Sequence, residues 1–150
     1  MAEAWTPPKW MYRDKHPPSD DAYFELMTRV IFLAGLNWNV INRKWPDFKK
    51  AFSGFSISEV AKFGEKDLER LVNDASIIRN RAKIVATIEN AKQFQEIGNR
   101  YGTFRAYFDG LDKSNNYASI VKELGRKFKR LAPSSARIFL YSIGERIEPP

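Results

Sequence analysis

The chain contains no cysteine and only one histidine, His16, among its 150 residues. Without cysteine, disulfides and thiolate-bound metal sites are excluded. A single histidine cannot form the usual histidine-rich zinc site either. We therefore expect a fold that is stabilised by its apolar core and a function that needs no metal or other cofactor.

Long apolar stretches are also missing. No run approaches the roughly 18 consecutive apolar residues that a membrane-spanning helix needs. The opening residues, MAEAWTPPKW, lack the basic and then apolar pattern of a signal peptide. The sequence therefore predicts a cytoplasmic protein without a membrane partner, and we expect it to be a monomer.

The residues that are present suit one folded domain. Hydrophobic residues make up 43% of the chain and aromatic residues 14%, which is sufficient for a core at this length. Lysine and arginine outnumber the acids and give a net charge of +7. That charge is compatible with a polyanionic partner, although it does not specify one.

The pattern divides the chain into an N-terminal arm, residues 1–18, and an all-α domain, residues 19–150. The arm is rich in proline and tryptophan, so we expect an extended segment held to the body by its aromatic side chains. Beyond it, apolar residues repeat with the helical period, and no convincing two-residue alternation appears. We expect seven to nine short helices, which include spans at about 20–33, after Asn37 with a separate turn from Pro46, at 65–72, at 77–100 and at 104–109.

A helical hairpin is expected at about 117–144. Two apolar stripes with i, i+3, i+4, i+7 spacing flank a turn: Tyr117, Ile120, Val121 and Leu124, then Ala136, Phe139, Leu140 and Ile143. Pro133 suits the first position of the second helix, where a missing N–H costs nothing. Gly144 is a plausible helix stop.

Basic residues gather on this hairpin, and its second helix offers free backbone N–H groups at its N-terminus. Such an arrangement suits sequence-independent contact with a nucleic-acid backbone. The candidate DNA-binding residues are Lys127, Lys129, Arg130, Ser134, Ser135 and Arg137. A surface hairpin with solvated charges is the alternative, and charge and periodicity alone leave both open.

Several stretches match the pattern of the family I 3-methyladenine DNA glycosylases. They are LAGLNW at 33–38, DLERL at 67–71, IIRNRAKI at 77–84, and residues 127–144, which align without a gap onto that family's helix-hairpin-helix. The stretches occur in the family's order and together extend over about 19–144. The chain therefore resembles a divergent, compact member of this family.

The resemblance implies a helix-hairpin-helix fold that binds damaged duplex DNA, flips out an alkylated purine and hydrolyses its N-glycosidic bond. A cationic 3-methylated purine suits an aromatic pocket because of cation–π attraction. Trp38 matches the family's pocket tryptophan, and Trp10 and Tyr12 in the arm are candidates for the same pocket. Core packing is the alternative role for Trp38.

Two family features are absent from the sequence. Val30 stands at the pocket position where the family carries its base-recognising glutamate, so that polar contact is lost. The family's zinc site needs cysteine and histidine near both ends, whereas this chain has no cysteine and has Pro149 at the expected C-terminal histidine. We therefore expect no zinc.

With that glutamate missing, Glu25 is the candidate catalytic carboxylate, because it matches a Phe-Glu pair of the family. It could act as a general acid or base if burial raises its pKa, or it could pair with an arginine; we favour the pairing. Arg81 and Lys83, from the IIRNRAKI stretch, are candidates for phosphate contact or for local salt bridges. Lys83 is not expected to be a Schiff-base nucleophile.

Three functions remain open at this point. A zinc-free DNA glycosylase acting on alkylated purines is favoured by Trp38 and the IIRNRAKI stretch, and we prefer it. A non-catalytic DNA-binding relative that has lost the glycosylase chemistry is favoured by Val30. A basic helical protein that binds another macromolecule through its arm is the third.

Overall fold

A computed structural model describes residues 7–13 and 15–149; residues 1–6, 14 and 150 lie outside the described residues, and with them much of the predicted arm. Within these ranges all of the regular secondary structure is helical, as the sequence predicts. The helices are α1 (Asp20–Leu33), α2 (Trp38–Ala51), η1 (Ser53–Phe55), α3 (Ile57–Val60), α4 (Glu65–Val72), α5 (Arg81–Tyr101), α6 (Phe104–Asp109), α7 (Ser114–Lys127) and α8 (Pro133–Ser142).

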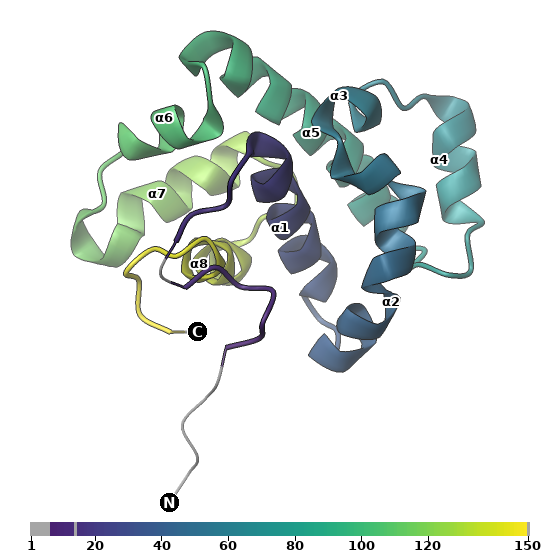
Figure 1. Ribbon diagram of the computed structural model, residues 1–150, viewed down its shortest axis with the longest axis horizontal. Coiled ribbons are helices and arrows are strands. Elements are labelled where there is room, and N and C mark those ends of the chain that lie inside the picture. Colours follow the sequence, from purple (N-terminus) through teal and green to yellow (C-terminus); the bar gives the residue numbers. More distant parts are fainter. Residues whose placement is uncertain (1–6, 14, 150) are drawn as a thin grey trace, which may run out of the picture.

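Helix α1 is the centre of the molecule. In Figure 1, α6, α7 and α8 lie on one side of it and α2, α3 and α4 on the other, while α5 contacts helices of both groups. Ser19 caps the start of α1 by accepting a hydrogen bond from the Ala22 N–H at 3.2 Å. Because other helices surround it, every residue from Leu26 to Leu33 is buried. None of the helices in the described ranges is long and apolar enough to span a membrane.

Helix α2 continues through Pro46, so the predicted separate turn at that residue is wrong. A proline inside a helix costs about 3 kcal/mol, because it removes one backbone hydrogen bond and its ring crowds the preceding turn. Against that cost, α2 buries one row of side chains along its length: Ile41, Trp45, Phe48 and Ala51. Full burial of a large apolar side chain contributes about 1.5–3 kcal/mol, so the row outweighs the proline.

Helix α5 starts at Arg81 rather than near residue 77 as predicted. The Asn80 side chain accepts a hydrogen bond from the Lys83 N–H at 3.1 Å and so acts as the N-cap. Before it, Asp74 accepts hydrogen bonds from both the N–H and the hydroxyl of Ser76. These local bonds hold residues 74–76 in a turn, which competes with helix formation.

The predicted hairpin is present as α7 and α8, which pack against each other. Pro133 occupies the first turn of α8, as expected. The connecting turn is fixed to α5 by Asn90, whose side chain accepts from the Lys129 N–H at 2.8 Å and donates to the Lys129 carbonyl at 3.1 Å. Asn90 is only 2% exposed, so this pair sets the position of the hairpin turn.

The described part of the arm lies over α1 and α8 (Figure 1). The Tyr12 N–H donates to the Ser142 carbonyl at 2.7 Å and ties the arm to the end of α8. Just beyond α8, Gly144 has a φ of +91°, and a Cβ there would lie 2.5 Å from the Lys15 carbonyl oxygen. Only glycine allows the arm to approach the chain this closely at this position.

Candidate active site and DNA interface

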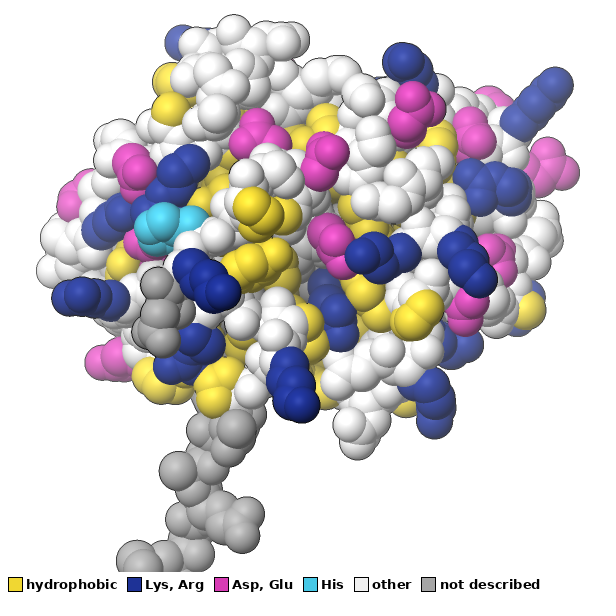
Figure 2. All heavy atoms as spheres, in the orientation of Figure 1, with side chains coloured by type: hydrophobic (Ala, Val, Ile, Leu, Met, Phe, Trp, Pro, Cys, Tyr) yellow, Lys and Arg dark blue, Asp and Glu magenta, His cyan; other side chains and the backbone are white. Residues whose placement is uncertain are grey.

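A cleft of about 550 Å³ opens between the arm and α1. Figure 2 shows this face of the molecule, on which lysine and arginine side chains border a recessed apolar surface. The lining residues come from the arm, α1 and α2: Lys9, Trp10, Met11, Tyr12, Arg13, Lys15, Ala22, Glu25, Leu26, Arg29 and Lys49. The cleft therefore contains three residues that the sequence singles out, which are Trp10, Tyr12 and Glu25.

Arg29 lies at the floor of this cleft and is 9% exposed. Its guanidinium carbon is 4.5 Å from the centre of the Trp10 ring and 4.9 Å from that of Trp45, both within cation–π range. One guanidinium nitrogen donates to Asn42 Oδ1 at 2.5 Å. Burial lowers the pKa of Arg29 to about 10, and the nearby Glu25 charge offsets part of that shift, so the side chain stays charged at neutral pH.

Glu25 presents its carboxylate at the wall of the cleft. Trp45 Nε1 donates to Glu25 Oε2 at 2.8 Å, and Lys49 Nζ lies 3.8 Å from the same oxygen. The predicted arginine partner is therefore not found, because the Arg29 guanidinium points to Asn42. The Glu25 side chain keeps 27% of its surface exposed, so it remains accessible from the cleft.

The four residues predicted for the base pocket do not form one pocket. Trp10 and Tyr12 line the cleft, and the Trp38 ring is half-buried beside Trp10, with 6.0 Å between ring centres and a 40° tilt. Val30 is only 1% exposed and packs in the core, which does not agree with a pocket-lining role. Val30 follows Arg29 directly, so on a helix the two side chains face different neighbours.

The turn of the hairpin presents a basic surface. Lys129, Arg130 and Ser134 are exposed, whereas Ser135 is only 3% exposed and its side chain cannot reach a ligand outside. No side chain caps the N-terminus of α8, where Ala132 is the N-cap residue, so the first N–H groups of this helix lack that kind of partner. This geometry is consistent with phosphate contact.

Arg81 lies next to that turn. It lines a shallow groove between α5 and the hairpin, together with Lys129 and Arg130. The structure thus brings together three of the predicted DNA-binding residues from two separate parts of the sequence.

Other predicted DNA-binding residues have partners within the protein. Lys83 Nζ donates to the Ala34 carbonyl at 2.8 Å and to the Phe32 carbonyl at 3.3 Å, so it caps the C-terminus of α1. Arg137 donates to the Asn116 carbonyl at 3.0 Å, and the Lys127 ammonium lies 5.1 Å from the centre of the Tyr107 ring. The structure favours internal roles for all three, because their polar ends contact the protein itself.

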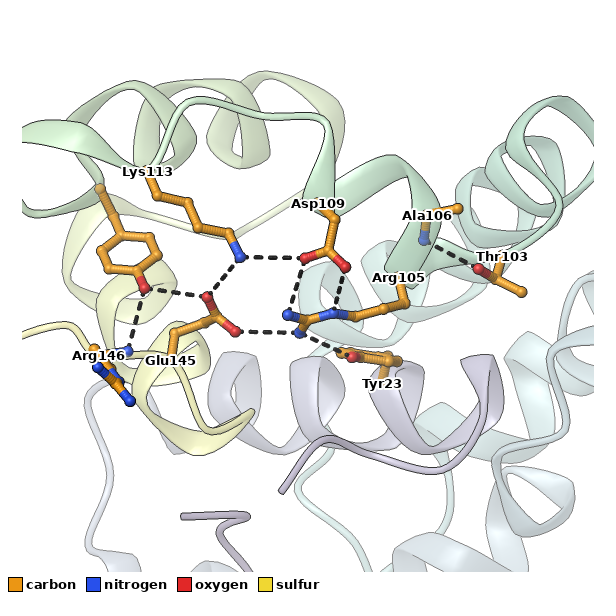
Figure 3. Close-up of polar contacts among 9 residues, drawn as sticks. Tyr23, Thr103, Arg105, Ala106, Asp109, Lys113, Glu145 and Arg146 are labelled. Carbon is orange, nitrogen blue, oxygen red and sulfur yellow. Dashed lines mark hydrogen bonds and ion pairs between the residues drawn. The ribbon is translucent and has the colours of Figure 1, made fainter. Parts of the chain in front are cut away.

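A second polar cluster lies where α1, α6, α7 and the C-terminal segment meet (Figure 3). Glu145 is at its centre, with a side chain that is 5% exposed, and its two oxygens contact Arg105 at 3.1 Å, Lys113 at 3.2 Å and the Tyr117 hydroxyl at 3.1 Å. Arg105 also pairs with Asp109 at 2.9 Å. Burial acts to lower the pKa of Arg105, but these partners hold it above its ordinary value.

Described residues from both terminal regions meet beside this cluster, so the zinc site implied by the resemblance can be tested there. Arg13 and His16 line one pocket with residues 144–147 and Pro149. No group of three or more histidine, cysteine, aspartate or glutamate side chains among the described residues could hold a metal, and Asp109 and Glu145 are paired with Arg105 and Lys113. The residues present therefore do not fit a zinc ion.

The described residues form an all-helical domain that combines a basic helical hairpin with an aromatic cleft. The chain belongs to the methyladenine glycosylase family, because the family model matches residues 7–138. That span includes the arm cleft and the hairpin turn.

Individual relatives agree with this membership. The chain is 42% identical over 74 residues to DNA-3-methyladenine glycosylase 1 of Escherichia coli K12, and 30% identical over 74 residues to DNA-3-methyladenine glycosylase of Haemophilus influenzae. The matched segments make up 49% of this chain for the first relative and 47% for the second. In each case they span 40% of the relative's own length.

Solved structures show the same fold. The 3-methyladenine DNA glycosylase I of Staphylococcus aureus matches 89% of this chain and 80% of its own, with a TM-score of 0.76 and 24% identity. A solution structure of a 3-methyladenine DNA glycosylase I, described in terms of alkylated-base recognition, matches 90% of this chain and 80% of its own, with a TM-score of 0.71 and 26% identity.

Sequence reasoning assigned no structural role to three residues that shape these regions: Arg29, Asn90 and Glu145. Arg29 had a visible signal, because it is a charged residue inside an otherwise apolar helix that was predicted to be buried. Asn90 and Glu145 had none, because their partners are 39 and 40 residues away in the sequence.

Proposed function

We propose that this chain is a DNA glycosylase that binds damaged DNA, flips out an alkylated purine of the 3-methyladenine class and hydrolyses its N-glycosidic bond. The observation that carries this proposal is the family match over residues 7–138, which contain both the cleft and the hairpin turn. A cytoplasmic location and a monomeric state stay predictions from the sequence.

In this proposal the hairpin binds the DNA backbone without reading sequence. Lys129 and Arg130 supply charge, and the uncapped N-terminus of α8 supplies backbone donors. Ser134→Asp combined with Lys129→Glu should weaken DNA binding, since both changes place negative charge at the contact. Neither side chain is buried, so unfolding should be unaffected; an unchanged DNA affinity would remove the hairpin from the interface.

The flipped base would be held by the aromatic side chains beside the cleft. Trp10 and Trp38 offer neighbouring ring faces, and Tyr12 lies on the same arm. Stacking between aromatic rings offsets the cost of taking the base out of the duplex. A purine that is already cationic through methylation is a good leaving group, so the site needs less help from a general acid than for an ordinary purine.

Glu25 is the proposed catalytic carboxylate, because it is the acidic residue among the described residues that line the cleft. As the base departs, positive charge develops on the sugar, and a fixed carboxylate stabilises that charge. The same group can accept a proton from the attacking water. The hydrogen bond from Trp45 and the ion pair with Lys49 hold the carboxylate in place without covering it.

The direct test is release of free base from DNA treated with a methylating agent, resolved by chromatography, with untreated DNA as the control. We expect 3-methyladenine to be released by the wild-type protein, and Trp38→Ala to lower release more than it lowers DNA binding. Absence of release with DNA binding intact would overturn the proposal and would support a DNA-binding relative without glycosylase chemistry. Thermal unfolding of Trp38→Ala checks that the variant is folded.

A further inference from the structure

The cleft beneath the arm has an imbalance of charge. Its described lining includes five basic side chains, Lys9, Arg13, Lys15, Arg29 and Lys49, against one carboxylate, Glu25. That carboxylate already accepts a hydrogen bond from Trp45 and lies 3.8 Å from Lys49. Four of the five cations are exposed around the opening, while Arg29 lies on the floor. The cleft therefore attracts negative charge.

Two donors on residues that line the cleft lack an acceptor among the described residues. Neither Arg29 Nε nor Trp10 Nε1 has a hydrogen-bond partner within the described part of the chain, and both atoms are buried. Buried donors are normally paired, because an unpaired one carries the full cost of its lost hydration. Arg29 also lacks a salt bridge to any described carboxylate, although its side chain is more than nine-tenths buried. An anionic oxygen would satisfy both its charge and its free donor.

We propose that this cleft binds a phosphate group of the DNA strand, with Arg29 as the buried contact and Lys49 at the rim. The inference rests on the proposed function, since it takes DNA as the substrate. It adds a second backbone contact, in the cleft beneath the arm and separate from the hairpin. A strand phosphate fits better than a free phosphate ion, because Trp10 and Tyr12 supply aromatic faces for the attached nucleotide.

Two neighbouring lysines on α2 provide a matched test. Lys49 lines the cleft, whereas Lys50 does not, and both are exposed. Each phosphate contact releases counterions, so the slope of log affinity against log salt concentration changes by about 0.9 for each contact with duplex DNA. We expect Lys49→Met to make this slope shallower by about that amount and Lys50→Met to leave it unchanged. Equal slopes for the two variants would overturn the role of the cleft.

Arg29→Met tests the buried contact, because methionine keeps an unbranched side chain between the two tryptophan rings. The slope should become shallower by about 0.9, while thermal unfolding shows that the variant is folded. Inorganic phosphate alone, followed through tryptophan fluorescence, distinguishes the two sources of the anion. Saturation by free phosphate in the wild type but not in Arg29→Met, with the DNA slope unchanged, would assign the site to a free anion and overturn the proposal.

Failure of this inference can be told apart from failure of the proposed function. If base is released from methylated DNA while the slopes of Lys49→Met and Arg29→Met match the wild type, the glycosylase stands and the cleft phosphate site is overturned. If no base is released while both slopes become shallower, the phosphate site is supported in a DNA-binding protein without glycosylase activity.

Discussion

Two partly or fully buried arginines show how differently this protein treats charge in its two polar regions. Arg105 contacts Glu145, Asp109 and the Tyr23 hydroxyl, and these partners hold its pKa above the ordinary value against the effect of burial. Among the described residues, Arg29 donates to Asn42 and lies against two aromatic faces, and burial lowers its pKa to about 10 although the Glu25 charge offsets part of that shift.

We interpret this difference as that between a structural cluster around Glu145 and a binding site around Arg29. The network around Glu145 joins α1, α6, α7 and the C-terminal segment, and its charges are matched within the protein. The cleft around Arg29 leaves a positive charge and a donor without a matching group, which is costly unless a ligand supplies it. Native proteins retain such groups mainly where they do chemistry or binding.

The largest expected loss of stability comes from breaking the cluster around Glu145. Glu145→Ala would leave Arg105, Lys113 and the Tyr117 hydroxyl without their shared acceptor, and the Glu145 side chain is 5% exposed. Removing one partner of a buried pair costs about 3 kcal/mol or more, so the free energy of unfolding in urea should fall by about 3 kcal/mol.

An exposed ion pair serves as the control for that substitution. Glu89 lies 3.6 Å from Lys92, and both side chains are about half exposed. Glu89→Ala should change stability by less than about 1 kcal/mol. If Glu145→Ala were no more harmful than Glu89→Ala, the Glu145 cluster would not be the structural element described above.

Arginine-to-methionine substitutions should move stability in opposite directions in the two regions. Arg29→Met removes a buried charge that has no ionic partner, so stability should rise by about 1 kcal/mol. Arg105→Met removes a cation that Glu145 and Asp109 require, so stability should fall. Urea unfolding of both variants measures this directly, and a loss of stability in both would contradict the contrast between the two arginines.

Acid should also destabilise the protein through the cluster around Glu145, by a smaller amount than the substitutions above. Burial alone would raise the pKa of Asp109, but hydrogen bonds from Arg105 and Lys113 outweigh it and hold that pKa below its ordinary value. A carboxylate with a lowered folded-state pKa contributes stability above its unfolded pKa and loses that contribution as pH falls through the folded value. Stability should therefore drop as pH falls below about 4, and the drop should be smaller in Asp109→Asn. Equal acid profiles for the two proteins would show that Asp109 is not stabilised by these cations.

The sequence predicted the helices well wherever one local rule decided the structure. The helices expected to start near 20 and 104 do so, with Ser19 and Thr103 as their caps, and Pro133 begins α8 as expected, because helix starts depend on residues within one turn. The predictions failed where tertiary packing or a competing turn decided. Helix α2 runs through Pro46 because a buried aromatic row supports it, and α5 begins late because Asn80 caps it.

The candidate site was predicted only in part, for the same reason. Trp10, Tyr12 and Glu25 do share one cleft, but their roles stay predictions. Lys83 resembled a surface cation, yet it caps α1 through two carbonyls that lie 49 and 51 residues away in the sequence. Such partners follow from how the helices pack, which residue spacing alone does not encode.

The most direct test of the central claim, that the arm cleft is the catalytic site, is the single-turnover rate of 3-methyladenine release by Glu25→Gln. Glutamine keeps the shape of the side chain and an acceptor for Trp45, but it removes the charge that would stabilise the developing sugar cation. With Glu59→Gln, an exposed change on α3, as the control, we expect Glu25→Gln to release base about 100-fold more slowly at an unchanged melting temperature. A wild-type rate in Glu25→Gln would contradict the account.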